Sequence, residues 1–168
     1  MLALGSGGGT GRLSVDGVPV GRGFALVYTH SMYKALSAEI FTVEGRRFTM
    51  RAVVSASGGV LDYYQLDGAR SRTPAGLYVL ALATPVTYDA LDLIATPVGR
   101  RTLLAGHRCL PLYPATGATS VRLALAPSTA GAGGPCPAAY NQSFFLNTVY
   151  NATEASATTS VEAQKPQS

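Results

Sequence analysis

Hydrophobic and polar positions between residues 12 and 127 follow the short period of β-strands. Residues 47–54 alternate between apolar and polar side chains, the pattern of a strand with one face in water. Gly, Pro or Asp interrupts such runs roughly every 10–14 residues, as turns between short strands do. Strands are predicted at residues 24–30, 39–43, 47–54, 60–66, 76–82, 101–105, 108–113 and 121–125. A helical turn or two is expected only at residues 87–94. The pattern therefore predicts an all-β fold: a single antiparallel β-sandwich or small barrel of about eight short strands.

The chain is expected to divide into a β-domain with a lead-in and a tail. The segments are a flexible Gly-rich lead-in at residues 1–11, the β-domain at 12–127 and a flexible C-terminal tail at 128–168. Within the tail, residues 128–139 are rich in Gly, Pro and Ala, and residues 152–168 are expected to be disordered. Residues 140–150 have the apolar content of a strand, which is either the last strand of the domain or a segment that pairs with another sheet edge.

Composition narrows the class of protein. Of 168 residues, 47% are hydrophobic and only 13% are charged, which excludes a coiled coil and a chain disordered throughout. No apolar run is long enough for a membrane-spanning helix, and the N-terminus lacks the features of a signal peptide. The net charge is +4, but the basic residues are scattered apart from Arg46-Arg47 and Arg100-Arg101. We therefore expect no nucleic-acid partner and contact with a membrane only by association.

Two cysteines and two glycosylation sequences bear on location. Cys109 and Cys136 are too few for a tetrahedral metal site, so we expect neither a metal nor another cofactor. They are either a single disulfide, which would indicate an oxidising compartment, or two unpaired thiols. Asn141 and Asn151 begin N-glycosylation acceptor sequences in a region rich in Ser, Thr and Ala. These features predict an extracytoplasmic or cell-surface protein whose export segment is not in this sequence.

The densest group of chemically useful side chains begins at Tyr28. Its candidate site residues are Tyr28, His30, Ser31, Glu39, Tyr63 and Tyr64. If strand 24–30 pairs with strand 39–43, Glu39 can reach the His30 imidazole, as the carboxylate of a hydrolytic triad does. However, Ser31 follows His30 directly, so the two side chains should point to opposite faces, and no nucleophile elbow is present.

Two other interpretations of this group remain open. In one, His30 is hydrogen-bonded at a strand end and Ser31 caps the turn that follows, so both are structural. In the other, the group forms a ligand pocket with aromatic walls that include Tyr33, and His30, Ser31 and Glu39 make the directional contacts. No catalytic residue is assigned.

The same residues carry a resemblance to a family. The segment from Tyr28 to Lys34, with its Tyr-Thr-His-Ser core and the later Glu39, resembles the DUF1850 family of uncharacterised proteins. Residues 57–64, 101–105 and 108–113 also look like that family, and the likeness spans roughly residues 12–127. Met32 stands where the family commonly has Val. The resemblance implies a small extracytoplasmic protein, often encoded beside TRAP transporters of the TAXI type, but it implies no activity.

These observations lead to two hypotheses of function. The first is a non-enzymatic extracytoplasmic β-domain that assists a TRAP-type transport system by binding a transporter component or a small solute. The alternative is a structural subunit of a cell-surface assembly, in which residues 140–150 pair with a neighbour's sheet and the chain forms a homo-oligomer.

Overall fold

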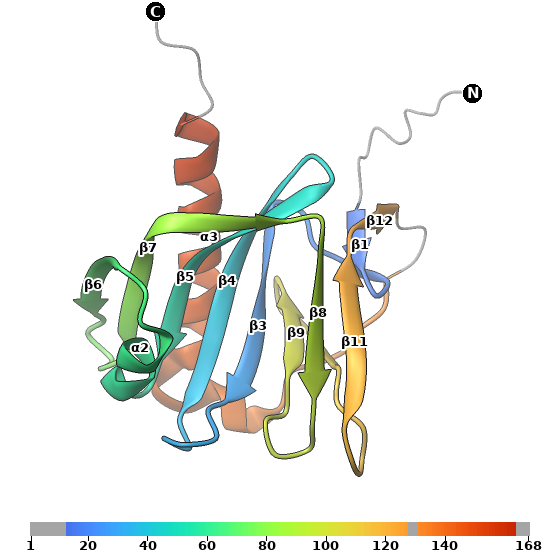
Figure 1. Ribbon diagram of the computed structural model, residues 1–168, viewed down its shortest axis with the longest axis horizontal. Helices are drawn as coiled ribbons and strands as arrows, with labels where there is room; N and C mark the ends of the chain where they lie inside the picture. The colour runs from blue at the N-terminus through green and yellow to red at the C-terminus, as the bar shows by residue number, and fades with distance from the viewer. Residues whose placement is uncertain (1–12, 128–130, 164–168) are drawn as a thin grey trace, which may run out of the picture.

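The computed structural model describes residues 13–127 and 131–163 and is built around one large antiparallel sheet. Its seven strands lie in the order β10-β9-β3-β4-β5-β7-β6 (Figure 1). Their bounds are β3 Gly23–Thr29, β4 Leu36–Glu44, β5 Arg47–Ser55, β6 Gly68–Arg72, β7 Tyr78–Tyr88, β9 Thr102–Ala105 and β10 Arg108–Pro111. The central strands β3, β4 and β5 are buried on both faces, which explains their long apolar runs.

Two small sheets cover one face of the large sheet. One pairs β8 (Ala90–Ala95) with β11 (Thr119–Ala124), and the other joins β1 (Leu13–Val15), β2 (Val18–Pro19) and β12 (Ala126–Pro127). Their apolar side chains share a core with Phe24, Phe41 and Phe48 of the large sheet, whose rings pack with centroids 5.0 to 5.6 Å apart. The architecture is sandwich-like, and the strands of the described chain do not close into a barrel. The all-β prediction is confirmed.

The C-terminal segment covers the opposite face, contrary to the sequence prediction. Residues 138–144 form the 3-10 helix η1 (Ala138–Phe144), and α3 (Phe145–Ala163) runs across the back of β4 (Figure 1). The expected strand at 140–150 is therefore wrong, as is the expected disorder from 152 to 163; residues 164–168 lie outside the described residues. The physical reason is that residues suited to burial recur at every fourth position, which places them on one face of a helix. Those residues are Phe145, Val149, Thr153 and Ala157, and all four are buried.

This helix also removes the basis of the structural-subunit alternative. Phe145 and Val149 are buried against the chain's own sheet. The apolar side chains that were expected to pair with a neighbour's sheet are therefore already packed within this chain. The preceding linker is fixed as well, since Gly134 makes an isolated β-bridge with Cys109. The expected lead-in at residues 1–11 and residues 128–130 of the linker lie outside the described residues.

Two further local predictions are wrong. Residues 60–66 were expected as a strand, but α2 (Gly58–Tyr64) is a short helix whose first turn is capped by the Ser57 hydroxyl, which accepts from the Gly59 N–H. Residues 87–94 were expected as helical turns, but they close β7 and form most of β8. Leu91 and Leu93 pack on the core while Asp92 and Ile94 are exposed, which is the period of a strand.

Candidate functional site

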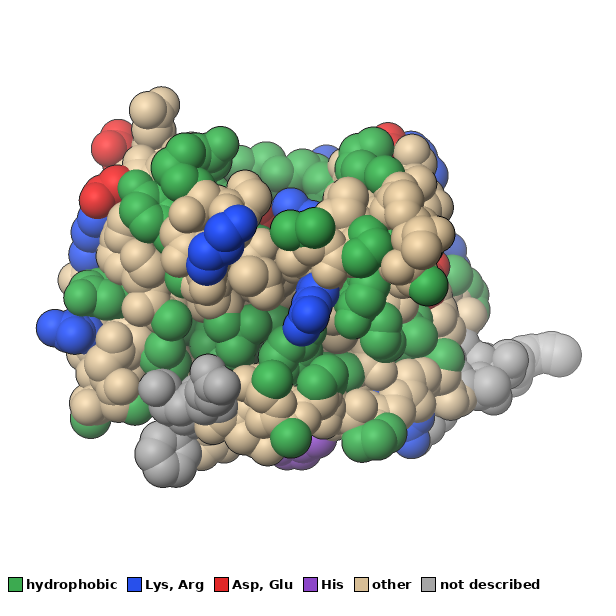
Figure 2. Space-filling view, turned by 90° about the horizontal axis from the view of Figure 1, so that it is seen from below, with side chains coloured by type: hydrophobic (Ala, Val, Ile, Leu, Met, Phe, Trp, Pro, Cys, Tyr) green, Lys and Arg blue, Asp and Glu red, His purple; other side chains and the backbone are tan. Residues whose placement is uncertain are grey.

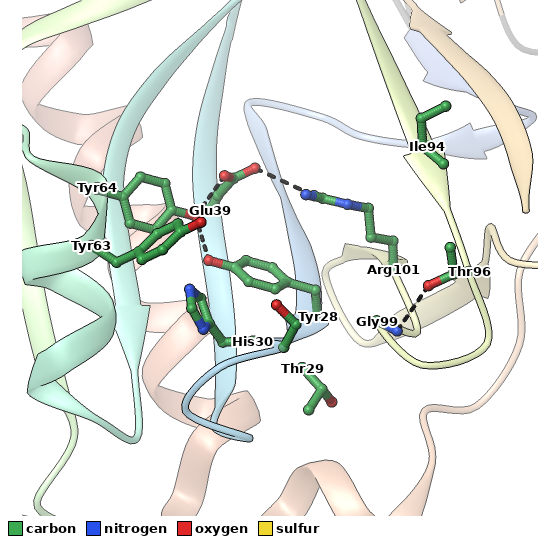
Figure 3. Close-up of a pocket in the computed structure, with 11 residues that line it drawn as sticks. Tyr28, Thr29, His30, Glu39, Tyr63, Tyr64, Ile94, Thr96, Gly99 and Arg101 are labelled. Atoms are coloured by element: carbon green, nitrogen blue, oxygen red, sulfur yellow. Dashed lines mark hydrogen bonds and ion pairs between the residues drawn. The ribbon is translucent and has the colours of Figure 1, made fainter.

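A pocket of about 480 Å³ opens at the end of β3 (Figure 3). The turn after β3 forms one wall, α2 forms a second, and the connection from β8 to β9 forms the third. It is lined by Tyr28, Thr29, His30, Ser31, Glu39, Tyr63, Tyr64, Ile94, Thr96, Gly99 and Arg101. All six candidate site residues from the sequence therefore border one cavity, whereas Tyr33 does not line it; its ring packs against that of His30, with centroids 5.3 Å apart.

A chain of hydrogen bonds crosses the floor of the pocket from β3 to β4. The Tyr64 hydroxyl donates to Oε2 of Glu39 at 2.6 Å, so the Tyr28 hydroxyl donates in turn to the oxygen of Tyr64. The strand register explains the geometry: Glu39 pairs with Leu26, which places its side chain on the same face of the sheet as that of Tyr28. Tyr64, which is itself hydrogen-bonded to Tyr28, thus fixes one oxygen of the carboxylate.

Arg101 completes the floor, and sequence reasoning missed it. Its Nη1 lies 3.8 Å from Oε1 of Glu39, and its guanidinium lies 5.1 Å from the centre of the Tyr28 ring. Arg101 lies just before β9. The loop that precedes it is held against the end of β3 by a hydrogen bond from the Thr29 N–H to the Gly99 carbonyl, at 2.8 Å, and this places Arg101 at the floor of the pocket. In the sequence, Arg100-Arg101 stands out only as a basic pair, and no local signal relates it to Glu39.

The tyrosine hydroxyls of the floor are uncharged at neutral pH, and burial makes them still harder to ionise. Desolvation, reinforced by the negative charge of Glu39 and partly offset by the Tyr64 hydrogen bond and Arg101, raises the pKa of Tyr28 to about 12. The pKa of Tyr64 is also raised, first by burial and then by the Glu39 charge. The floor therefore holds one negative and one positive charge, surrounded by neutral hydroxyls.

The side chain of His30 is hydrogen-bonded within its own turn. Its Nδ1 accepts the backbone N–H groups of Met32 at 3.2 Å and Tyr33 at 3.3 Å, and burial lowers the pKa of its imidazole. The expected contact with Glu39 is wrong, because Glu39 lies opposite Leu26, four residues or about 13 Å along the strand from His30. Within the described part of the chain, no hydrogen bond joins His30 to Ser31, whose side chain is exposed.

The remaining candidate residues lie away from this pocket. Cys109 and Cys136 form a disulfide with their Cα atoms 4.9 Å apart, linking β10 to the segment before η1. Asn141 and Asn151 are exposed, but Thr153 of the second acceptor sequence is buried and its hydroxyl donates to the Val149 carbonyl at 2.8 Å. In the folded chain that threonine therefore faces the sheet.

Across residues 13–127 and 131–163, no group of three or more His, Cys, Asp or Glu side chains is placed to hold a metal ion. No described helix combines the length and the apolar character that crossing a membrane requires. Comparison with known proteins found no matching family model, no matching curated protein and no matching solved structure. Membership of the DUF1850 family stays a prediction.

Proposed function

We propose that this chain is a non-enzymatic extracytoplasmic binding module, which holds a small solute in the pocket at the end of β3 and serves a TRAP-type transport system. The observation that carries the proposal is the floor of the pocket. Tyr28, Tyr64, Glu39 and Arg101 orient one another there before any ligand arrives. Polar groups fixed in this way inside an aromatic-walled cavity are typical of small-molecule sites.

The state of each polar group favours binding over catalysis. A nucleophile or general base needs a free lone pair on a group whose pKa suits neutral pH. The pKa values of Tyr28 and Tyr64 are raised rather than lowered toward neutral pH, while Nδ1 of His30 already accepts two backbone N–H groups. Oε2 of Glu39 accepts from Tyr64, and Oε1 lies 3.8 Å from Nη1 of Arg101, where it is open to a donor of the ligand. These groups are suited to hydrogen-bonding a ligand rather than to activating a nucleophile.

The rim of the pocket supports a protein partner. Among the described residues, seven large hydrophobic side chains are exposed, and six of them line the pocket or stand within three positions of a lining residue. These six are Met32, Tyr33, Tyr63, Leu66, Ile94 and Val98. Figure 2 views the end of the molecule where β3 finishes and shows hydrophobic side chains over much of that face, with a hollow near its middle. Apolar surface gathered around a pocket is typical of a docking face.

The location rests on the disulfide and on the family resemblance. Disulfides persist in oxidising compartments and are rare in the cytosol, so the Cys109–Cys136 bond supports an extracytoplasmic protein. The transporter role rests on the resemblance of residues 12–127 to DUF1850 proteins. It makes a permease or a solute-binding protein of the TAXI type the expected partner.

Photo-crosslinking in intact native cells tests the proposal. A photoreactive amino acid replaces Val98 at the rim in one variant and Val86 in the other, since Val86 is exposed on β7 and does not line the pocket. The expected result is a crosslink from position 98, but not from position 86, to a permease or solute-binding protein identified by mass spectrometry. Crosslinks from position 98 only to other copies of this chain would overturn the transporter role.

A further inference from the structure

We infer that the pocket takes a neutral, polyhydroxylated ring: a monosaccharide or disaccharide whose hydroxyls bridge Glu39 and Arg101 and whose apolar face lies on Tyr63. This inference rests on the proposed binding function and gives it a ligand class. It follows from the spacing of the floor groups, the balance of charge and the kinds of side chain in the walls.

The spacing of Glu39 and Arg101 leaves room for hydroxyl groups. Nη1 of Arg101 and Oε1 of Glu39 are 3.8 Å apart, beyond hydrogen-bonding distance, although the other carboxylate oxygen is well bonded to Tyr64. One sugar hydroxyl can donate to Oε1 while a neighbouring oxygen accepts from the guanidinium, because a hydroxyl group is both donor and acceptor. Such a ligand makes two charge-assisted hydrogen bonds without separating the ion pair.

The balance of charge selects against charged ligands. Glu39 and Arg101 have only 14% and 28% of their side chains exposed, so a surplus charge beside them is poorly screened. A carboxylate bound to Arg101 would stand next to Glu39, and an ammonium group bound to Glu39 would stand next to Arg101. A zwitterion would have to part the two side chains, each of which is held by a tyrosine: Glu39 by the hydroxyl of Tyr64, and Arg101 by the ring of Tyr28.

The walls offer a platform for the apolar face of a ring. Tyr63 lines the pocket with 59% of its surface exposed, and its ring is supported edge to face by His30, with centroids 4.7 Å apart. The C–H bonds of a sugar ring pack against the face of an aromatic ring. They bury apolar area there and contact the negatively polarised face of the ring. The pocket volume of about 480 Å³ lies within the range of small-molecule sites.

The experiment is a matched ligand panel measured by saturation-transfer NMR on the full chain. Methyl glucoside is compared with glucuronate, glucosamine and sorbitol, which add a negative charge, add a positive charge or remove the ring; methyl galactoside and leucine extend the panel. The expected result is binding of at least one methyl glycoside more tightly than of its charged, acyclic or zwitterionic counterparts. The complex should shift the ring resonances of Tyr63.

Variants locate that binding in the pocket. Glu39→Gln and Arg101→Lys should each weaken it about tenfold or more, as loss of a hydrogen bond to a charged group does. Arg100→Lys is the matched control, because its side chain is exposed and does not line the pocket. Backbone amide spectra verify that each variant is folded, and Arg101→Lys serves alone if Glu39→Gln does not fold.

The outcomes separate the ligand class from the function. If a charged or zwitterionic compound binds more tightly than the glycosides and Arg101→Lys weakens it, the pocket binds solutes but the inferred class is wrong. If neither the panel nor a general fragment library shifts the Tyr63 ring, the ligand class and the proposed solute binding both fail.

Discussion

The two faces of β4 show how one strand contributes to two different regions. Toward α3 it presents Ala38 and Ile40, which are fully buried among the apolar side chains of the helix. On the other face it presents Glu39, which is held by a tyrosine hydroxyl and faces an arginine at the floor of a cavity. The α3 face is closed by apolar packing, whereas the pocket end keeps partly buried polar groups that point into open space. Polar groups that are partly buried cost stability unless they are paired, and Glu39 is paired with Tyr64 and Arg101; under our proposal the same groups also bind the ligand.

The largest expected effect tests whether apolar packing alone holds the α3 face. Phe145→Ala should lower the free energy of unfolding by about 3–5 kcal/mol, because the ring is fully buried and its removal leaves a cavity. Urea denaturation measures this loss. Thr158→Ala, on the exposed side of the same helix, should stay within about 0.5 kcal/mol of the parent. A loss below about 1 kcal/mol for Phe145→Ala would mean that α3 adds little to the folded sheet.

The disulfide should stabilise the α3 face and leave the pocket end unchanged. Replacing Cys109 and Cys136 together by Ala should cost about 3 kcal/mol of unfolding free energy, because the bond closes a long loop in the unfolded chain. Amide NMR shifts of α2, which lines the pocket, should not move. Shifts across α2 in the double variant would show that the two regions are coupled.

Alkaline pH should weaken the fold through the pocket end. An unfolded tyrosine ionises near pH 10, whereas the pKa of folded Tyr28 is about 12, so the unfolded state loses its proton first. Stability is therefore retained below pH 10 and falls as the pH rises from 10 toward 12, by about 2–3 kcal/mol from Tyr28 alone. Tyr28→Phe should flatten this pH dependence in urea titrations; an unchanged slope would show that the buried hydroxyl does not resist ionisation.

The parts that the sequence predicted are those that local patterns determine. The pairing of β3 with β4 follows from their apolar runs, and it brings Tyr28 and Glu39 onto one face of the sheet. Arg101 could not be found in this way, because its place depends on the pairing of β9 with β3, between segments far apart in the chain. The helix α3 was missed for another reason: two of its four buried contact residues, Thr153 and Ala157, are small and not strongly hydrophobic, so composition masked the repeat of four.

The smallest expected change in stability gives the sharpest test of the contrast between the two regions. Tyr63 is 59% exposed and makes an edge-to-face contact with His30, so Tyr63→Ala should lower the free energy of unfolding by less than about 1 kcal/mol. The same change should weaken glycoside binding several-fold, since it removes the ring platform, and isothermal titration calorimetry measures that loss. Phe145→Ala should behave in the opposite way, with a large loss of stability and unchanged affinity in the fraction that remains folded. If Tyr63→Ala instead destabilises the fold strongly and leaves binding intact, Tyr63 is structural and the pocket end is not separable from the core.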